Sequence, residues 1–275
     1  MTISVIVSTF NQPERLEKVL LGYQYQTINN FEVVIADDGS GEETRNLINR
    51  YKEMNIYPIQ HVWHEDDGFR KSTILNKAIS ASKGEYLVIT DGDCIPRADF
   101  LEVHQNNAQE GYFISGGMFR LTLDVAEKIT FEDIKTQRCF DVNYLHQLGQ
   151  PKKLFKDLKC KLKKESYKKL ANTITPANAS WNGHNSSGWK TDIIRVNGFD
   201  ERMRYGGQDR ELGERLMNFG IKGKQLRFSA ICLHLEHKRG YVTKEDWARN
   251  YQIRKETKEK KANWTPYGLL RRTTA

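Results

Sequence analysis

The sequence predicts an α/β protein with a mostly parallel central sheet, flanking helices and a helical carboxyl-terminal tail. Two observations indicate this class. Short apolar strands alternate with helical patterns through the first 90 residues, and each strand is apolar along nearly its whole length, as in parallel sheets that are covered on both faces. In addition, a polar cluster follows each strand, at the sheet edge where such folds bind their ligands.

The expected elements follow one another in regular order. Strands are expected over residues 3–7, 31–36, 56–63 and 86–90, and helices over 13–26, 42–51 and 72–82. Asn11 and Ser40 are the expected caps of the first two helices, and Gly84 is expected to end the third. Beyond residue 99 the pattern is less regular. It predicts a strand at 112–117, a helix at 210–219 and a charged helix at 244–261.

The chain has 275 residues, of which 38% are hydrophobic and 28% charged, a composition typical of one large globular domain. No apolar run approaches the ~18 residues of a membrane span, and the first residues lack the pattern of a signal peptide, so we expect a cytoplasmic protein. The cysteines at 94, 139, 160 and 232 form no CxxC pair. Reduced thiols are therefore expected rather than a zinc site.

The net charge of +8 has a local source, because nine lysines fall between residues 152 and 169. Leu154, Leu158 and Leu162 recur there every four residues, which predicts an amphipathic helix with a basic face. Two interpretations stand side by side: the helix rests on an anionic membrane surface, or its lysines form a solvated face. We expect no nucleic-acid partner, since the sequence has no RNP, helix-turn-helix or zinc-finger signature.

Polar clusters follow the four expected strands, at residues 8–11, 37–40, 64–71 and 91–93. The last is Asp91-Gly92-Asp93, in which Gly92 is expected to let the backbone turn sharply. Two carboxylates one residue apart can face one cation together, and hard oxygen ligands suit Mn²⁺ or Mg²⁺ rather than zinc. Such a triplet alone is more often an Asx turn, but its place after the fourth strand favours a ligand site.

These motifs and two later ones resemble those of family 2 glycosyltransferases, which have the GT-A fold with a Rossmann-like sheet. The matching stretches are 5–11, 34–40, 84–93, 196–201 and 206–213. The later stretches also resemble the carboxyl-terminal part of galactosyl- and N-acetylgalactosaminyltransferases. The resemblance implies a GT-A domain over 1–240 and a charged helical tail over 241–275. Within the domain, 1–115 is the nucleotide-sugar half, and 116–240 is the acceptor half with a basic helical insert at 151–170.

The resemblance also implies roles on the donor side. Ser8 and Asp38 match positions that hold the uracil and ribose of a UDP-sugar, and Arg70 matches a position that contacts the nucleotide or its phosphate. A carboxylate suits the uracil N3–H, and the fork of an arginine suits phosphate. Asp91 and Asp93, on either side of Gly92, match the DxD motif. In it the second acid binds the metal, and the first contacts the ribose or metal-bound water.

His234 matches the histidine that completes the metal site of related enzymes, and His237 is the alternative ligand. On the acceptor side, Asp209 aligns with the catalytic base, whereas Glu211 is expected to point elsewhere. Alternatively Asp209 caps the helix that starts at Arg210, where the helix amino terminus would lower its pKa.

Trp181 and Trp189 stand near the acceptor motif. Their flat apolar faces can stack on a sugar ring, or they can be core residues. The sequence leaves both interpretations open.

The implied activity is inverting, metal-dependent transfer of a sugar from a UDP-sugar to a hydroxyl of a growing surface glycan, such as capsule, O-antigen or lipopolysaccharide. The acceptor is a glycan or lipid-linked glycan, and the enzyme is cytoplasmic or peripheral at the inner face of the cell membrane. The alternative function is a nucleotide-sugar-binding protein without catalysis. A nucleotidyltransferase would share the first half of the chain but would leave the stretch 206–211 unexplained.

Overall fold

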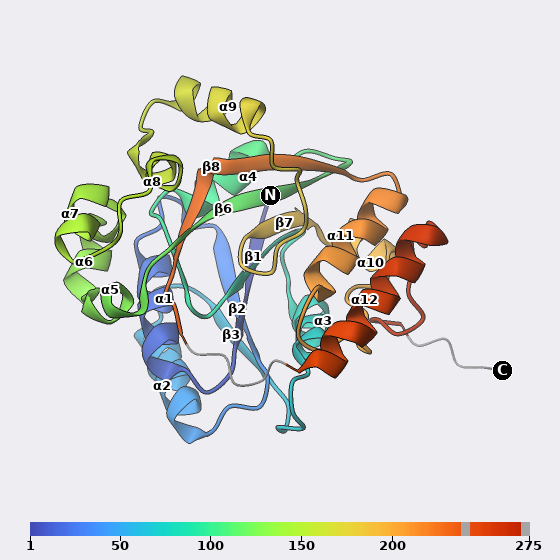
Figure 1. The fold of residues 1–275 in the computed structure, drawn as a ribbon. Helices are drawn as coiled ribbons and strands as arrows, with labels where there is room; N and C mark the ends of the chain where they lie inside the picture. Colours follow the sequence, from blue (N-terminus) through green and yellow to red (C-terminus); the bar gives the residue numbers. More distant parts are fainter. Residues whose placement is uncertain (238–242, 271–275) are drawn as a thin grey trace.

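A computed structural model describes residues 1–237 and 243–270 of the chain, and within them eight strands form one curled sheet (Figure 1). The strands are β1 (Ile3–Thr9), β2 (Phe31–Asp37), β3 (Ile59–Trp63), β4 (Tyr86–Asp91), β5 (Cys94–Pro96), β6 (Tyr112–Arg120), β7 (Ser186–Trp189) and β8 (Lys222–His234). Their order across the sheet is β3-β2-β1-β4-β7-β6-β8-β5. The predicted class, α/β with a mostly parallel central sheet, is confirmed.

The four strands of the first half run parallel, so their carboxyl ends meet at one edge. β1 pairs with β2 and β4, and Ser8 lies opposite both Ala36 and Asp91 in these pairs. β7 then runs antiparallel to both β4 and β6, and β8 runs parallel to β6. The register thus places Ser8, Asp38 and Asp91 at the same edge of the sheet, as the strand pattern predicted.

The helices are α1 (Pro13–Gln24), α2 (Glu42–Met54), α3 (Lys71–Ala81), α4 (Phe100–Asn107), α5 (Leu123–Lys128), α6 (Phe131–Lys135), α7 (Val142–Gln147), α8 (Leu154–Lys161), α9 (Glu165–Ile174), α10 (Lys190–Arg195), α11 (Gln208–Asn218) and α12 (Lys244–Glu259). A 3₁₀ turn covers Arg138–Phe140. Among the described residues, no helix combines the length and apolar composition needed to cross a membrane.

Alternating residues of each central strand belong to two apolar clusters, one on each face of the sheet. Val5 and Val7 pack with Leu16 and Val19 of α1, whereas Ile6 packs with Ile74 of α3. Figure 1 shows α1 and α2 on one side of the sheet and α3, α10 and α11 on the other. Burial on both faces therefore explains why the strands read as continuous apolar runs.

The third strand begins at Ile59, three residues later than predicted. The caps of the first two helices also differ from the prediction. The caps are Gln12 and Gly41, neither with a side-chain capping bond. Asn11 and Ser40 instead form hydrogen bonds between the loop after β1 and the loop after β2. The Asn11 backbone N–H donates to Ser40 Oγ, and its Oδ1 accepts from the Gly41 N–H, both at 2.9 Å. These polar residues thus join the loops that follow β1 and β2.

Gly84 and Gly92 act through their small size rather than through a special backbone angle, since neither has a positive φ. α3 ends at Ala81, so Gly84 is not its cap. A Cβ at Gly84 would lie 2.5 Å from the backbone N of Ser4. A Cβ at Gly92 would lie 3.0 Å from the carbonyl oxygen of Ser8, which accepts a hydrogen bond from the Gly92 N–H. Both glycines therefore let a neighbouring strand pass closely.

The basic insert is not one helix. α8 ends at Lys161, the backbone is extended at Leu162, and α9 begins at Glu165 as a separate helix. Lys159 turns inward, where its Nζ donates to the carbonyl oxygen of Met118 on β6 at 2.6 Å. A leucine at every fourth position suggested one continuous helix, but the backbone is extended at Leu162, and α8 and α9 pack on β8 as separate helices.

The carboxyl-terminal segment packs onto the body of the protein beside α11 (Figure 1). Asn250, Ile253 and Thr257 of α12 are buried, and the Asn197 side chain donates to the carbonyl oxygen of Thr265 at 2.7 Å. The predicted boundary between residues 240 and 241 lies outside the described residues.

Candidate active site

A cavity of about 450 Å³ opens at the carboxyl ends of β1, β2 and β4. Its walls include Ser8, Asp38, Asp91, Gly92, Asp93, Asp209 and His234, which are all of the predicted site residues except Arg70. His237, the alternative metal ligand, also lines the cavity. The two halves of the chain thus contribute to a single polar cavity.

Asp93 lies against two histidines from the end of β8. Its Oδ2 is 3.0 Å from His237 Nε2 and 3.4 Å from His234 Nε2, because β5 and β8 pair antiparallel with Cys94 opposite His234. Potential ligand atoms of Asp93, His234 and His237 all lie within 4.8 Å of one another. The sequence left His234 and His237 as alternatives, and the structure brings both to Asp93.

The protonation states of this group suit a cation. Burial alone would raise the pKa of Asp93, yet His237 and His234 beside it hold that pKa at about 2. Burial lowers the pKa of His234, which favours the neutral imidazole that can ligate. One carboxylate and two imidazoles are donors that a divalent first-row metal such as Mn²⁺ accepts. Asp91 and Cys94 form a second group with Asp93.

Asp91 is paired with Lys71, a residue that the sequence analysis did not select. Lys71 Nζ is 2.5 Å from Asp91 Oδ1, which also accepts from Ser8 Oγ at 2.9 Å. Burial opposes the charge on Lys71, but Asp91 and Asp209 nearby raise its pKa well above the ordinary value, so the ammonium is charged. The signal was available, because Lys71 ends the polar cluster 64–71 and is the first residue of α3.

Arg70 is the predicted site residue that the structure does not bring to the cavity. Its guanidinium lies 3.0 Å from Asp67 and is 38% exposed. Its backbone N–H instead donates to Asp38 Oδ2 at 3.0 Å, while His64 Nε2 lies 2.8 Å from Asp38 Oδ1. Burial raises the pKa of Asp38, although these hydrogen bonds act to lower it. Asp38 is therefore held in place by the loop that carries Arg70 and His64.

Asp209 is the second residue of α11, and Gly207 with a φ of +86° is the amino-terminal cap. The alternative in which Asp209 caps this helix is therefore wrong. Burial, opposed by Lys71 and reinforced by Asp91, raises the pKa of Asp209 to about 6, not below its ordinary value. Its Oδ1 is buried without a hydrogen-bond partner, and a Cβ on Gly183 would lie 2.6 Å from its Oδ2. A carboxylate with this pKa can accept a proton near neutral pH.

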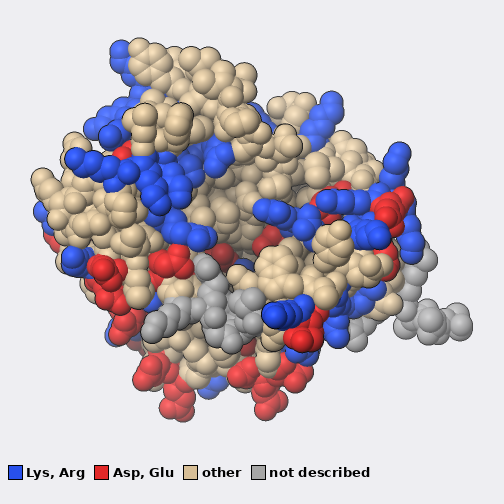
Figure 2. All heavy atoms as spheres, in the orientation of Figure 1, with Lys and Arg blue, Asp and Glu red and all other residues tan. Residues whose placement is uncertain are grey.

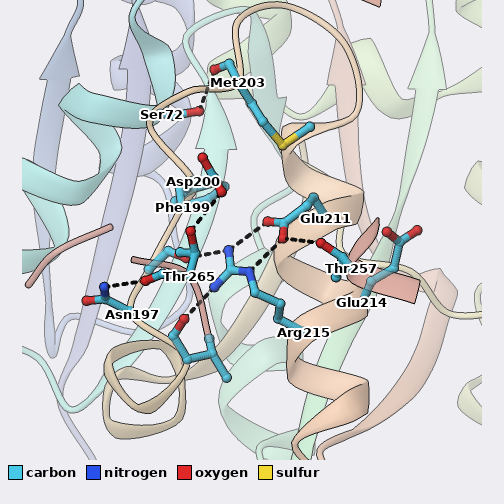
Figure 3. A network of polar contacts seen from close by, with 12 residues as sticks. Ser72, Asn197, Phe199, Asp200, Met203, Glu211, Glu214, Arg215, Thr257 and Thr265 are labelled. Atoms are coloured by element: carbon cyan, nitrogen blue, oxygen red, sulfur yellow. Dashed lines mark hydrogen bonds and ion pairs between the residues drawn. The ribbon is translucent and has the colours of Figure 1, made fainter. Parts of the chain in front are cut away.

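Glu211 points away from the cavity, as expected from the sequence. It forms a buried bidentate ion pair with Arg215 at 2.8 and 2.7 Å and accepts from Thr257 Oγ1 of α12 at 3.0 Å (Figure 3). Arg215 in turn donates to the carbonyl oxygens of Val196 and Gly198. This network joins α11 to the preceding loop and to the carboxyl-terminal helix.

Asn250 of α12 holds the loop that leads into Asp209. Its single amide nitrogen lies 3.1, 3.0 and 2.8 Å from the carbonyl oxygens of Arg204, Tyr205 and Gly206. Asn250 is only 1% exposed. Tyr205 lines the cavity, so a residue 45 positions further along the chain holds this wall in place.

The two tryptophans near the acceptor motif do not face the cavity. Trp181 is fully buried in the core beside Phe113, and Trp189 packs edge-on against Tyr86. The sugar-stacking interpretation of Trp181 is therefore wrong, and the core interpretation is confirmed. Neither tryptophan lines the cavity.

Comparison with known proteins finds two family models that match this chain. The glycosyl transferase family 2 model matches residues 4–156, and the model described as the N-terminal domain of galactosyltransferase matches residues 173–238. A chondroitin synthase of Escherichia coli is 26% identical over 251 residues, covering 85% of this chain and 34% of that protein. A hyaluronan synthase of Pasteurella multocida is 35% identical over 95 residues, covering 34% of this chain and 10% of that protein. The chain spans about a third or less of the length of these relatives.

Solved structures share the fold. The mannosyltransferase PcManGT from Pyrobaculum calidifontis, in complex with GDP-Man and Mn²⁺, has a TM-score of 0.59 and 20% identity, covering 94% of this chain and 61% of that chain. S. aureus TarS 1–349, in complex with UDP-GlcNAc, has a TM-score of 0.61 and 17% identity, covering 92% and 64%. Since the family match extends over more than half of its residues, the chain belongs to glycosyl transferase family 2.

Proposed function

We propose that this chain is an inverting, metal-dependent glycosyltransferase that moves a hexose or N-acetylhexosamine from a UDP-sugar to a hydroxyl of a growing surface glycan. One observation carries the proposal. Asp209 and the group of Asp93, His234 and His237 line the same cavity, and Lys71 interacts with the carboxylates of both sides. An acid–base group and a cation site facing one cavity is the arrangement that sugar transfer requires.

The donor is proposed to bind along the carboxyl ends of the strands. Asp38 and Ser8 would contact the nucleoside, and Lys71 would stand near the diphosphate as a fixed positive charge. The residues that would hold Mn²⁺ or Mg²⁺ are Asp93, His234 and His237, with Asp91 beside them. A bound cation would neutralise the charge that develops on the leaving diphosphate. The structural neighbours that hold GDP-Man with Mn²⁺ or UDP-GlcNAc support this assignment.

The transfer follows from the position of Asp209. The acceptor hydroxyl gives its proton to a carboxylate oxygen of Asp209 as its own oxygen attacks the anomeric carbon. The bond from that carbon to the diphosphate breaks, and UDP leaves with the electron pair. Attack opposite to the leaving group inverts the anomeric centre. A positioned base contributes about 10²–10⁴-fold to such a step.

The glycan acceptor is proposed from the relatives. The curated matches include a chondroitin synthase and a hyaluronan synthase, which are named for polysaccharides. A growing glycan or lipid-linked glycan at the cytoplasmic face of the membrane fits the same assignment. The second candidate is a protein that binds a nucleotide sugar without transferring it, and it predicts donor binding with no turnover.

Calorimetry of UDP binding with and without Mn²⁺ tests the donor and metal assignments. We expect binding that requires the metal and that is lost in Asp93→Ala. A panel of UDP-sugars is then incubated with the protein, and hydrolysis is measured to identify the donor. Metal-linked UDP binding without hydrolysis or transfer of any donor would favour the binding-protein alternative. The absence of UDP binding, with GDP and dTDP also failing, would contradict the proposal.

A further inference from the structure

Helix α9 is oriented with its polar side toward the protein. Lys168 is 8% exposed and faces Asp99 at 3.8 Å. The Asn172 side chain accepts from the Phe228 backbone N–H at 2.9 Å and donates to Ser229 Oγ at 2.8 Å. A helix on the surface of a soluble protein usually packs its apolar side on the core, so α9 has the reverse arrangement.

The outward side of α9 is apolar. Tyr167, Leu170 and Ile174 are 55%, 57% and 70% exposed, and their spacing of three and four residues places them in one stripe along the helix. At the start of α8, Leu154 and Phe155 are 69% and 81% exposed. Figure 1 shows α9 projecting from the body of the molecule, with α8 directly beneath it. These two helices therefore offer large apolar side chains to whatever lies outside the protein.

Lysines lie on one side of this apolar stripe, along α8 and the start of α9. Of the nine between residues 152 and 169, seven are exposed: Lys152, Lys153, Lys156, Lys161, Lys163, Lys164 and Lys169. The stretch contains only two acids, Asp157, which is buried, and Glu165. Figure 2 shows Lys and Arg side chains gathered below α9, in the region that α8 occupies in Figure 1. We call these seven lysines and the five exposed apolar residues the α8–α9 surface.

We propose that the α8–α9 surface docks on an anionic lipid bilayer. Headgroups of a bilayer match the lysines, and its acyl region accepts the aromatic and aliphatic side chains at the same time. A second copy of this chain would bring the same cluster of lysines against this one, which is repulsive. A soluble polyanionic glycan would pair with the lysines but would leave the apolar stripe in water. The bilayer is the partner that satisfies both features.

One connection between this surface and the cavity runs through β6. Lys159 of α8 donates to the carbonyl oxygen of Met118, and Met118 and Arg120 of β6 line the cavity. Docking through α8 and α9 would therefore place a bilayer on the β6 side of the site. An acceptor attached to a lipid would then approach Asp209 from the membrane surface. Docking itself does not depend on the proposed transfer and can be measured without any sugar.

Sedimentation of the full chain with vesicles tests the proposal. We expect binding to phosphatidylcholine vesicles that contain phosphatidylglycerol, weakening as salt is added, and little binding to phosphatidylcholine alone. Lys163→Gln/Lys164→Gln/Lys169→Gln should reduce partitioning about a hundredfold. The matched control removes three exposed lysines from α12 and its end, Lys255→Gln/Lys260→Gln/Lys261→Gln, and should keep most of the binding.

A second pair of variants tests the apolar stripe. Leu170→Ser/Ile174→Ser should reduce binding at every salt concentration, whereas Met54→Ser/Ile56→Ser, which removes exposed side chains near the end of α2, should not. Folding of each variant is checked by its thermal transition, and donor hydrolysis in solution should be unchanged. Three results would overturn the proposal: no binding of the wild-type chain to anionic vesicles at low salt, equal losses in the control variants, or lipid-free dimers that Leu170→Ser/Ile174→Ser abolishes.

Discussion

The two walls of the cavity are built in different ways. The donor-side wall consists of strand ends, where Ser8 and Asp91 stand opposite each other in adjacent parallel strands. The acceptor-side wall is the loop of Tyr205 to Asp209, which Asn250 of α12 holds through the carbonyl oxygens of Tyr205 and Gly206. One wall follows directly from the sheet register, and the other needs side-chain hydrogen bonds from a helix 44 to 46 residues further along the chain. The carboxyl-terminal helix α12 therefore supports one wall of the site without lining the cavity.

The comparison predicts two kinds of defect. Changes at the strand ends should affect nucleotide or metal binding, since the side chains there come from the rigid sheet. Changes in the acceptor-side wall should leave UDP binding intact and reduce turnover. Each variant is therefore characterised by two losses, that of UDP affinity and that of turnover.

The largest effect is expected for Asp209→Asn. Asparagine keeps the shape of the side chain but cannot accept the proton, so transfer should fall about 10²–10⁴-fold. UDP binding, measured by calorimetry with Mn²⁺, should change less than about twofold. Asp67→Asn is the comparison variant and should keep wild-type transfer, because Asp67 is exposed and does not line the cavity. If Asp209→Asn transfers sugar at the wild-type rate, Asp209 is not the catalytic base.

A smaller loss is expected for Lys71→Met. Lys71 pairs with Asp91 and lowers the pKa of Asp209, so its removal should weaken UDP binding about ten- to a hundredfold and move the acid limb of the pH–rate profile upward. Lys83→Met, an exposed lysine just beyond α3, is the control. If Lys71→Met has the same UDP affinity and the same pH–rate profile as the wild type, the position of Lys71 between the two walls has no functional role.

Sequence patterns could predict the donor-side wall because its chemistry and its location share one cause. An apolar strand followed by a polar cluster places that cluster at the edge of a parallel sheet. The residues at 8, 38, 91 and 93 needed no knowledge of distant contacts. The choice between Arg70 and Lys71 did need it, because adjacent side chains leave the start of a helix in different directions, and only Lys71 meets Asp91.

The acceptor-side wall could be predicted only in part. The motif gave Asp209, but the sequence suggested a lowered pKa from the helix terminus. In the folded chain, burial outweighs the opposing charge of Lys71, and the pKa of Asp209 is raised. Asn250 carries no pattern at all, since it is one polar residue in a charged helix. The broken insert likewise shows that leucine spacing cannot tell which side of a helix meets the body.

Asn250→Ala tests the acceptor-side wall directly. Three carbonyl contacts of one buried amide are lost, which should loosen the Tyr205 loop and lower kcat about tenfold with little change in UDP affinity. Asn218→Ala is a matched control, because Asn218 donates to the carbonyl oxygens of Thr257 and Ala262 and lies at the other end of α11. Both variants should lower the melting temperature, but only Asn250→Ala should slow turnover. Equal kcat values in the two variants would show that Asn250 has a structural role alone.

The last effect is a pH-dependent change in stability at Asp209. Because its folded pKa of about 6 lies above the unfolded value near 4, the folded state holds its proton more tightly, and the wild type loses stability as pH rises through this window. Asp209→Asn should therefore be more stable than the wild type at pH 8, by about 2–3 kcal/mol, and equal to it below pH 4. Thermal unfolding of both proteins across this range measures the difference.

Acid also destabilises the fold through His104 and His184, because burial lowers their pKa values to about 4. Both proteins contain these histidines, so their contribution cancels when the stability of the wild type is subtracted from that of Asp209→Asn. Asp67→Asn, at an exposed acid, should follow the wild type at every pH. A constant offset between Asp209→Asn and the wild type, without dependence on pH, would mean that the carboxylate is not desolvated. Its place beside Lys71 and Asp91 would then give it no raised pKa and no advantage as a base near neutral pH.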